Sequence, residues 1–389
     1  MQIRLGVLTL SLLFFLAGCV KVETIPDGEK EATRGFEKDN PKEGMSKRTL
    51  LIYMIASNLG EDLKNNLKLI TSVTTKENLN GGHLLVYYSE NREKARLFEI
   101  KPNEKGVPTE YIIRNYEGES AVSKETMRNV INEVVSLYPA DSYGMLLSSH
   151  ASAWMPVGYH TMLRAFGEEN GKWFEIDELA EAIPDNLFDF LLFDACSMGA
   201  IECMYELKDK ANYIVASPSE ILTVGFPYQT ILPHLFTKEA DLANVAKDFY
   251  EFFKTYVYPV GNISVTVTKE LDGLAAITKE ILNGDEKAVE SLLVSEMQVL
   301  SYLPKSPVAL VDFGDMIKHL ATGEQYQRFE KALKKAVLYP YSTKQIYATT
   351  GSYYDVTTYS GLSVYPLRSD YTELNNWYKN RLRWYQAVF

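Results

Sequence analysis

Apolar runs and amphipathic segments alternate along the first half of the chain. Apolar runs predict strands at residues 48–56, 83–90, 96–101, 143–150, 187–196 and 212–216. Helical spacing of apolar positions predicts helices at residues 61–73, 124–137 and 174–183, and from residue 198 onward, with further helices after residue 216. This alternation is typical of a mostly parallel α/β sheet, in which functional groups gather at the carboxyl ends of neighbouring strands.

The first residues have the pattern of an export signal. A basic residue precedes an apolar run over residues 5–20, which is shorter than the roughly 20 residues of a spanning helix. The sequence Leu16-Ala17-Gly18-Cys19 resembles a bacterial lipobox, which is cleaved before the cysteine and lipidated on its sulfur. The alternative is an ordinary signal peptide cut at Ala17-Gly18.

A polar, charged stretch follows over residues 21–47 and indicates a flexible tether. We therefore expect a signal peptide at residues 1–18, a lipidated tether at 19–47 and a folded body at 48–389. The lipid anchor predicts attachment to a membrane of the bacterial cell envelope, on the periplasmic or outer surface.

Composition limits the class of protein. The chain has 389 residues, of which 46% are hydrophobic and 23% charged, values typical of a folded globular protein. Intrinsic disorder, collagen and coiled coil are excluded as descriptions of the whole chain. The net charge is −11, and because no long Lys/Arg-rich stretch stands out, we expect no nucleic-acid partner.

Cysteine usage points to a free thiol. With Cys19 assigned to the lipid, Cys196 and Cys203 remain, seven residues apart. On a single helix they would lie about 10.5 Å apart along the axis, beyond disulfide reach. A retained thiol in an exported protein favours a catalytic role, although free cysteine is also a common small core residue. We assign that structural role to Cys203, which sits in the middle of a predicted helix.

His150 and Cys196 each end a predicted strand, which places them at one shared crevice. A thiolate is a nucleophile and an imidazole transfers protons near neutral pH, so the pair suits acyl transfer. We expect the dipole of the following helix to lower the pKa of Cys196. Nearby backbone N–H groups are candidates for stabilising an oxyanion. On these residues alone, structural roles for both side chains stay open.

Two blocks of sequence resemble the clostripain family of cysteine peptidases, in the caspase-like clan. They are SSHASAW around His150 and LLFDACSMGAIECMYELKDKANYIVASPSE around Cys196. Supporting matches are IYMIASNLGEDL, GFPY at residues 225–228, YSGLSVYP at 359–366 and the aromatic C-terminal stretch NNWYKNRLRWYQAVF, which looks like the family's closing helix. The resemblance spans residues 48–389.

The resemblance implies an α/β fold: a caspase-like α/β/α sandwich with a mostly parallel central sheet and C-terminal embellishments. It implies cleavage of protein or peptide substrates after a basic residue, with Cys196 as nucleophile and His150 as the catalytic histidine. Asp194 matches an acidic residue that helps select Arg or Lys, as a carboxylate would; the alternative is a helix cap or loop hydrogen bond. The N–H groups of Ala151 and Cys196 would hold the oxyanion.

Family members are often cut between the histidine and the cysteine, and Arg164 is the expected self-processing site. The chemistry requires no cofactor, and calcium enters through the resemblance only. The chain departs from the family pattern at Ala151 and Ala153, where glycines are usual, and at Ser57, where an acidic residue is typical. These departures keep a second reading open: a non-catalytic pseudo-peptidase lipoprotein that binds peptides or an envelope partner.

Overall fold

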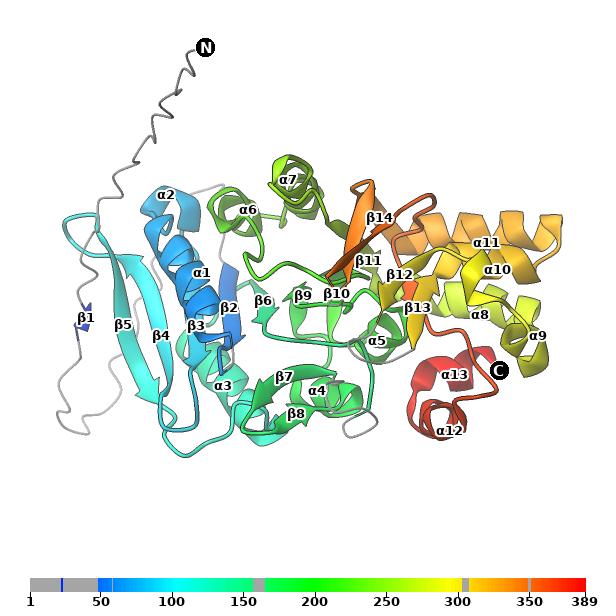
Figure 1. The fold of residues 1–389 in the computed structure, drawn as a ribbon. Coiled ribbons are helices and arrows are strands. Elements are labelled where there is room, and N and C mark those ends of the chain that lie inside the picture. The colour runs from blue at the N-terminus through cyan, green and yellow to red at the C-terminus, as the bar shows by residue number, and fades with distance from the viewer. Residues whose placement is uncertain (1–21, 24–47, 58, 157–164, 303–307, 349–350) are drawn as a thin grey trace, which may run out of the picture.

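A ten-stranded sheet runs through the part of the chain that the computed structural model describes, residues 22–23, 48–57, 59–156, 165–302, 308–348 and 351–389 (Figure 1). The strands, in spatial order, are β1 (Val22–Glu23), β5 (Pro108–Asn115), β4 (Ala95–Pro102), β3 (His83–Ser89), β2 (Arg48–Ile55), β6 (Ser142–Ser148), β9 (Phe188–Asp194), β10 (Ala211–Ala216), β11 (Asn262–Val267) and β14 (Val337–Ser342). The five neighbouring strands from β3 to β10 run parallel. On one side of them β4 pairs antiparallel with β3 and with β5, and on the other side β11 pairs antiparallel with β10 and with β14.

Helices cover both faces of this sheet (Figure 1). One face packs under α1 (Gly60–Ser72), α2 (Lys76–Leu79), α6 (Tyr228–Leu235) and α7 (Leu242–Thr255). The other packs against α3 (Lys124–Leu137), α4 (Ile176–Ala182) and α5 (Ile201–Glu206). The central strand β2 is buried along its whole length because apolar side chains on both of its faces meet a helical layer. The architecture is the expected α/β/α sandwich.

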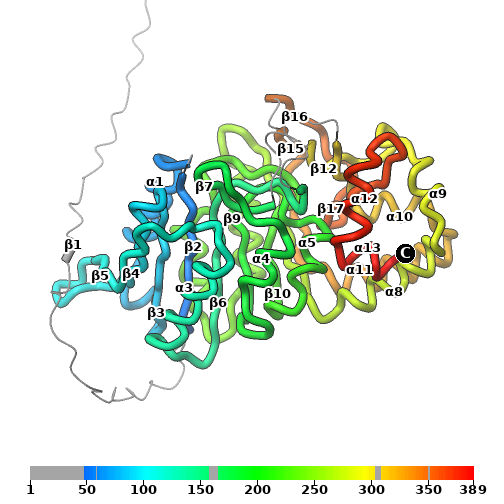
Figure 2. Tube along the Cα trace, turned by 90° about the horizontal axis from the view of Figure 1, so that it is seen from below, coloured from blue at the N-terminus to red at the C-terminus, as the bar shows by residue number. Residues whose placement is uncertain are grey.

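A C-terminal group of elements extends the sandwich beyond β10 (Figure 2). Its helices are α8 (Leu271–Leu282), α9 (Glu286–Glu290), α10 (Phe313–Leu320), α11 (Gly323–Ala336), α12 (Thr372–Arg381) and α13 (Arg383–Val388). In this group β12 (Val299–Tyr302), β13 (Ala309–Asp312) and β17 (Ser363–Val364) form one small sheet, and β15 (Gln345–Ala348) pairs with β16 (Ser352–Asp355). A separate hairpin between β6 and α4 pairs β7 (Phe166–Glu169) with β8 (Lys172–Phe174). Among the helices described, none is long and apolar enough to cross a membrane.

Most predicted elements of the first half are confirmed within a few residues. Four expectations were wrong in detail. Strands β6 and β9 end at Ser148 and Asp194 rather than at 150 and 196, and the helix after β9 begins at Ile201 rather than 198. The closing aromatic segment forms two short helices rather than one, because Leu382 between them has extended backbone (φ −90°, ψ 126°). Strand β5 had no counterpart among the predicted elements.

Candidate active site

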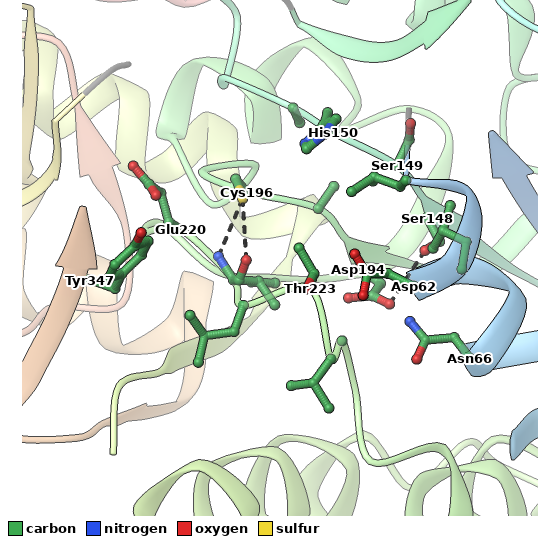
Figure 3. Close-up of a pocket in the computed structure, with 18 of the residues that line it drawn as sticks. Asp62, Asn66, Ser148, Ser149, His150, Asp194, Cys196, Glu220, Thr223 and Tyr347 are labelled. Carbon is green, nitrogen blue, oxygen red and sulfur yellow. Dashed lines mark hydrogen bonds between the residues drawn. The ribbon is translucent and has the colours of Figure 1, made fainter. Parts of the chain in front are cut away.

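Strand register brings His150 and Cys196 together. Ser148 of β6 pairs with Asp194 of β9 in a parallel ladder, and each catalytic candidate follows its strand by two residues. Neighbouring strands lie about 4.8 Å apart, so both side chains reach the same edge of the sheet. They line one cavity of about 730 Å³, which Figure 3 shows with both residues on its wall. The predicted juxtaposition of histidine and cysteine is present.

The Cys196 thiol sits in a tight loop and is partly exposed. Its Sγ accepts a hydrogen bond from the Ile221 N–H at 3.3 Å and lies 3.6 Å from the Ile221 carbonyl oxygen. Burial, followed by the negative charge of Glu220, raises the pKa of Cys196 to about 12. The expectation of a lowered pKa was wrong for this conformation, because α5 begins five residues later and the charges that act on the thiol are carboxylates.

This environment predicts slow alkylation of Cys196 near neutral pH. With a pKa of about 12, the thiolate fraction and therefore the rate with iodoacetamide rise about tenfold per pH unit between pH 7 and 10. Cys203 is fully buried in α5, and burial raises its pKa well above the ordinary value, so it stays unlabelled while the protein is folded. Mass spectrometry of modified peptides measures both rates. A rate for Cys196 that levels off near pH 7 would contradict the prediction.

The loop after His150 adopts a conformation that glycine favours. The His150 carbonyl accepts a hydrogen bond from the Gly167 N–H at 2.9 Å, and Ala151 forms an antiparallel bridge with Phe166. Ala153 is buried with φ +56°, a left-handed backbone that costs energy for alanine. The backbone at position 153 thus has the left-handed conformation that suits the family's usual glycine, although the residue here is alanine. Among the described residues, no backbone carbonyl accepts a hydrogen bond from the N–H of Ala151 or Cys196.

Asp194 lies buried at the base of the cavity, with 7% of its surface exposed. Its carboxylate accepts hydrogen bonds from the Tyr228 hydroxyl at 2.5 Å and from the Ser148 hydroxyl at 3.4 Å. Burial raises its pKa to about 6 against the opposing effect of these hydrogen bonds, so the group is mostly ionised at pH 7. The backbone of Phe226, in the loop before α6, also hydrogen-bonds to this carboxylate, so the structural role considered for Asp194, a loop hydrogen bond, is present alongside a carboxylate in the cavity wall.

Two further residues shape the space around this carboxylate. Gly225 has φ +68°, and a Cβ there would lie 2.6 Å from Asp194 Oδ2 and 2.8 Å from Asn66 Nδ2, so only glycine leaves this space open. Asn66 is buried, and its Nδ2 has no hydrogen-bond partner among the described residues. An unsatisfied buried amide beside a carboxylate suits a polar ligand group. Sequence reasoning missed Asn66, Gly225 and Tyr228, although the GFPY motif contains two of them.

The C-terminal segment, residues 363–389, contacts both the loop after His150 and the loop and helix after Cys196. On the cysteine side, the Ser363 N–H donates to the Gly199 carbonyl at 3.1 Å, and the Tyr365 N–H donates to Glu202 Oε1 at 2.9 Å. On the histidine side, Trp154 is fully buried and packs against aromatic rings, at centroid distances of 5.4 Å (Tyr365), 5.7 Å (Trp377) and 4.9 Å (Tyr378). The C-terminal segment thereby ties the two loops to each other.

The charges that line the cavity are acidic. In the described part of its wall, Asp62, Asp194 and Glu220 are carboxylates, and no lysine or arginine is present. The described residues contain no group of three or more His, Cys, Asp or Glu side chains arranged to hold a metal ion. Cys19 and Arg164, the predicted lipidation and processing residues, lie outside the described residues.

Comparison with known proteins places this geometry in a family. The model of the clostripain family matches residues 52–388. A solved structure of an inactive zymogen C11 protease from Parabacteroides distasonis is 38% identical, covers 89% of this chain and 99% of its own, and superimposes with a TM-score of 0.81. A secreted C11 cysteine protease from Bacteroides thetaiotaomicron, iotapain, is 28% identical, with 89% and 99% coverage and a TM-score of 0.77. A search of curated proteins gives no match.

These findings define a caspase-like cysteine peptidase fold. The chain belongs to the clostripain family. A further solved structure, a secreted C11 cysteine protease from Bacteroides thetaiotaomicron in complex with an irreversible peptide inhibitor, is 26% identical, covers 88% of this chain and 99% of its own, and has a TM-score of 0.77. Membership in a family of peptidases supports peptides as the substrate class.

Proposed function

We propose that the protein is a cysteine endopeptidase that hydrolyses peptide bonds after Arg or Lys. The observation that carries this proposal is one cavity lined by His150, Cys196 and Asp194, with the buried carboxylate at its base. A guanidinium or ammonium group that enters the cavity would pair with Asp194, and this attraction would offset the loss of hydration that burial imposes on the carboxylate. The complex of a relative with an irreversible peptide inhibitor supports a peptide as substrate, and the acidic cavity wall supports a cationic one.

In the proposed mechanism the Cys196 thiol transfers its proton to His150 and attacks the carbonyl carbon of the scissile bond. The N–H groups of Ala151 and Cys196 would donate to the oxyanion. His150 then protonates the leaving amine, which departs as the C–N bond breaks and a thioester forms. Water, deprotonated by His150, hydrolyses the thioester and releases the acid, and the proton returns to the sulfur.

The thiol environment suits a resting state that precedes activation. A thiol with a pKa of about 12 and an Sγ engaged by Ile221 is a poor nucleophile. The similar chain from Parabacteroides distasonis is described as an inactive zymogen. We propose that a cut after Arg164 activates this protein. We further propose export and anchoring to the cell envelope through a lipid on Cys19.

Substrate profiling tests the function. Purified protein and its Cys196→Ala variant are incubated with a diverse peptide mixture, and cleavage sites and the protein's own mass are read by mass spectrometry. We expect cuts after Arg or Lys that vanish in the variant, together with a self-cut at Arg164. Cysteine-dependent cuts after other residues would refute the basic specificity. Absence of cutting by wild-type protein, with the chain intact, would favour the peptide-binding alternative.

A further inference from the structure

The wall of the cavity opposite Asp194 has no part in the mechanism above. Glu220 and Tyr347 line it, and Figure 3 shows both on the far side of Cys196 from Asp194. Glu220 is close enough to the sulfur for its charge to raise the pKa of Cys196. A carboxylate placed beside a nucleophilic thiol disfavours the thiolate, so its presence in this position calls for another explanation.

The backbone on both sides of Glu220 is anchored to the cysteine loop. The Ile221 N–H donates to Cys196 Sγ at 3.3 Å. The Ser219 carbonyl accepts from the Ser197 N–H at 2.8 Å, and the Ser219 hydroxyl accepts from the Asn262 side-chain amide at 2.7 Å. These bonds fix the position of Glu220 relative to the reacting sulfur, and such rigid support is what a recognition residue requires.

Tyr347 adds an aromatic surface to the same wall. Its ring lies 5.8 Å from that of Tyr353, which stacks with Tyr258 at 6.4 Å, and Tyr258 also lines the cavity. Tyrosine faces attract cations. An aromatic face and a carboxylate on one wall are complementary to a basic side chain with an apolar stem.

We propose that Glu220 and Tyr347 form a second recognition subsite, which binds a basic side chain adjacent to the residue held by Asp194. This inference rests on the proposed peptidase function. Successive side chains of an extended peptide point in opposite directions. If the residue before the scissile bond points toward Asp194, its immediate neighbours point toward the opposite wall, where Glu220 lies. Preferred substrates therefore carry paired basic residues.

Occupation of this subsite also acts on the nucleophile. A substrate cation beside Glu220 offsets the negative charge that faces the sulfur, so the thiolate forms more readily once a matching substrate is bound. Neutralising Glu220 by mutation has the same electrostatic effect without substrate. We expect Glu220→Gln to accelerate iodoacetamide labelling of Cys196 severalfold at pH 8, with Cys203 still unlabelled. An unchanged labelling rate would contradict this coupling.

Peptides that differ by one charge test the subsite. Each peptide has Arg before the scissile bond. The residue immediately before or immediately after this Arg is either arginine or citrulline, and citrulline has nearly the same shape as arginine without the charge. Affinity is measured by fluorescence anisotropy on the Cys196→Ala variant, with and without Glu220→Gln. Cleavage of the same peptides is measured with intact Cys196 by mass spectrometry. Asp62→Asn is the matched control, because Asp62 lines the same cavity at the Asp194 end (Figure 3).

At one of the two positions we expect arginine to be favoured over citrulline about 10- to 100-fold, as for a charge-assisted contact. Glu220→Gln should reduce this preference to less than about threefold, whereas Asp62→Asn should retain it. If the Glu220→Gln variant kept the full preference for arginine over citrulline, or if the parent protein showed no such preference, the proposal would be overturned. Preferential binding of arginine peptides without cysteine-dependent cleavage would refute the proposed function but support the subsite. Cysteine-dependent cleavage without a preference for arginine over citrulline would support the proposed function but refute the subsite.

Discussion

Replacing Asp194 with asparagine should lower kcat/KM for substrates with Arg or Lys before the scissile bond by roughly 10²- to 10³-fold, as for removal of one partner of a buried charge pair. The amide oxygen can still accept the hydrogen bond from Tyr228, which holds the carboxylate at 2.5 Å in the parent protein, so the fold should persist. The loss follows from a cation that enters a buried site and finds no charge to pair with.

Asp62→Asn removes the same charge from an exposed position on the cavity wall and should lower kcat/KM only a few-fold, with a strong dependence on salt. Steady-state kinetics on Arg, Lys and neutral peptides separates the two variants. Equal losses on basic and neutral peptides in Asp194→Asn would show a structural defect and refute the role of Asp194 in specificity.

The raised pKa of Asp194 adds a pH signature to this prediction. Burial raises the pKa to about 6, so the carboxylate of the free protein becomes neutral as the pH falls through 6. We expect kcat/KM for basic peptides to fall over this range, because kcat/KM reports the ionisation of the free enzyme. The titration step should be missing from the Asp194→Asn profile. A wild-type profile without this step would contradict the assignment.

The sequence predicts the parallel core and the placement of His150 and Cys196 at one cavity, because apolar strand patterns and strand ends are local signals. Asp194 follows from the family resemblance rather than from spacing. The pKa of Cys196 does not follow from local sequence, because it is raised first by burial of the thiol in the folded chain and then by Glu220, 24 residues away in the chain. Asn66 and Gly225 meet Asp194 only through tertiary packing, which no periodicity reveals.

The C-terminal contribution to the site also lies beyond local pattern. An aromatic stretch near residue 380 is typical of core packing, and nothing in its spacing indicates a partner at Trp154, more than 200 residues earlier. The structure shows that this packing adjoins the histidine loop, while Ser363 and Tyr365 hold the cysteine loop. The segment is therefore positioned to set the distance between His150 and Cys196.

Trp154→Ala should consequently impair turnover in addition to stability. Loss of a fully buried tryptophan costs about 3–5 kcal/mol of unfolding free energy. A displaced histidine loop should also lower kcat about 10²-fold, the effect of a misplacement near 1 Å. Thermal unfolding gives the stability, and kinetics well below the melting temperature gives kcat.

Trp384→Ala is the matched comparison. Trp384 is equally buried in the C-terminal segment, but its ring contacts are with Tyr205 and Phe313 rather than with the histidine loop. It should lose a similar amount of stability and keep kcat within about threefold of wild type, since its packing does not position a reacting group. If both variants lost kcat equally at matched fractions folded, the effect would not be specific to the histidine loop, and the orienting role of Trp154 would be refuted. A loss specific to Trp154→Ala would mean that the C-terminal aromatic packing orients His150 for proton transfer.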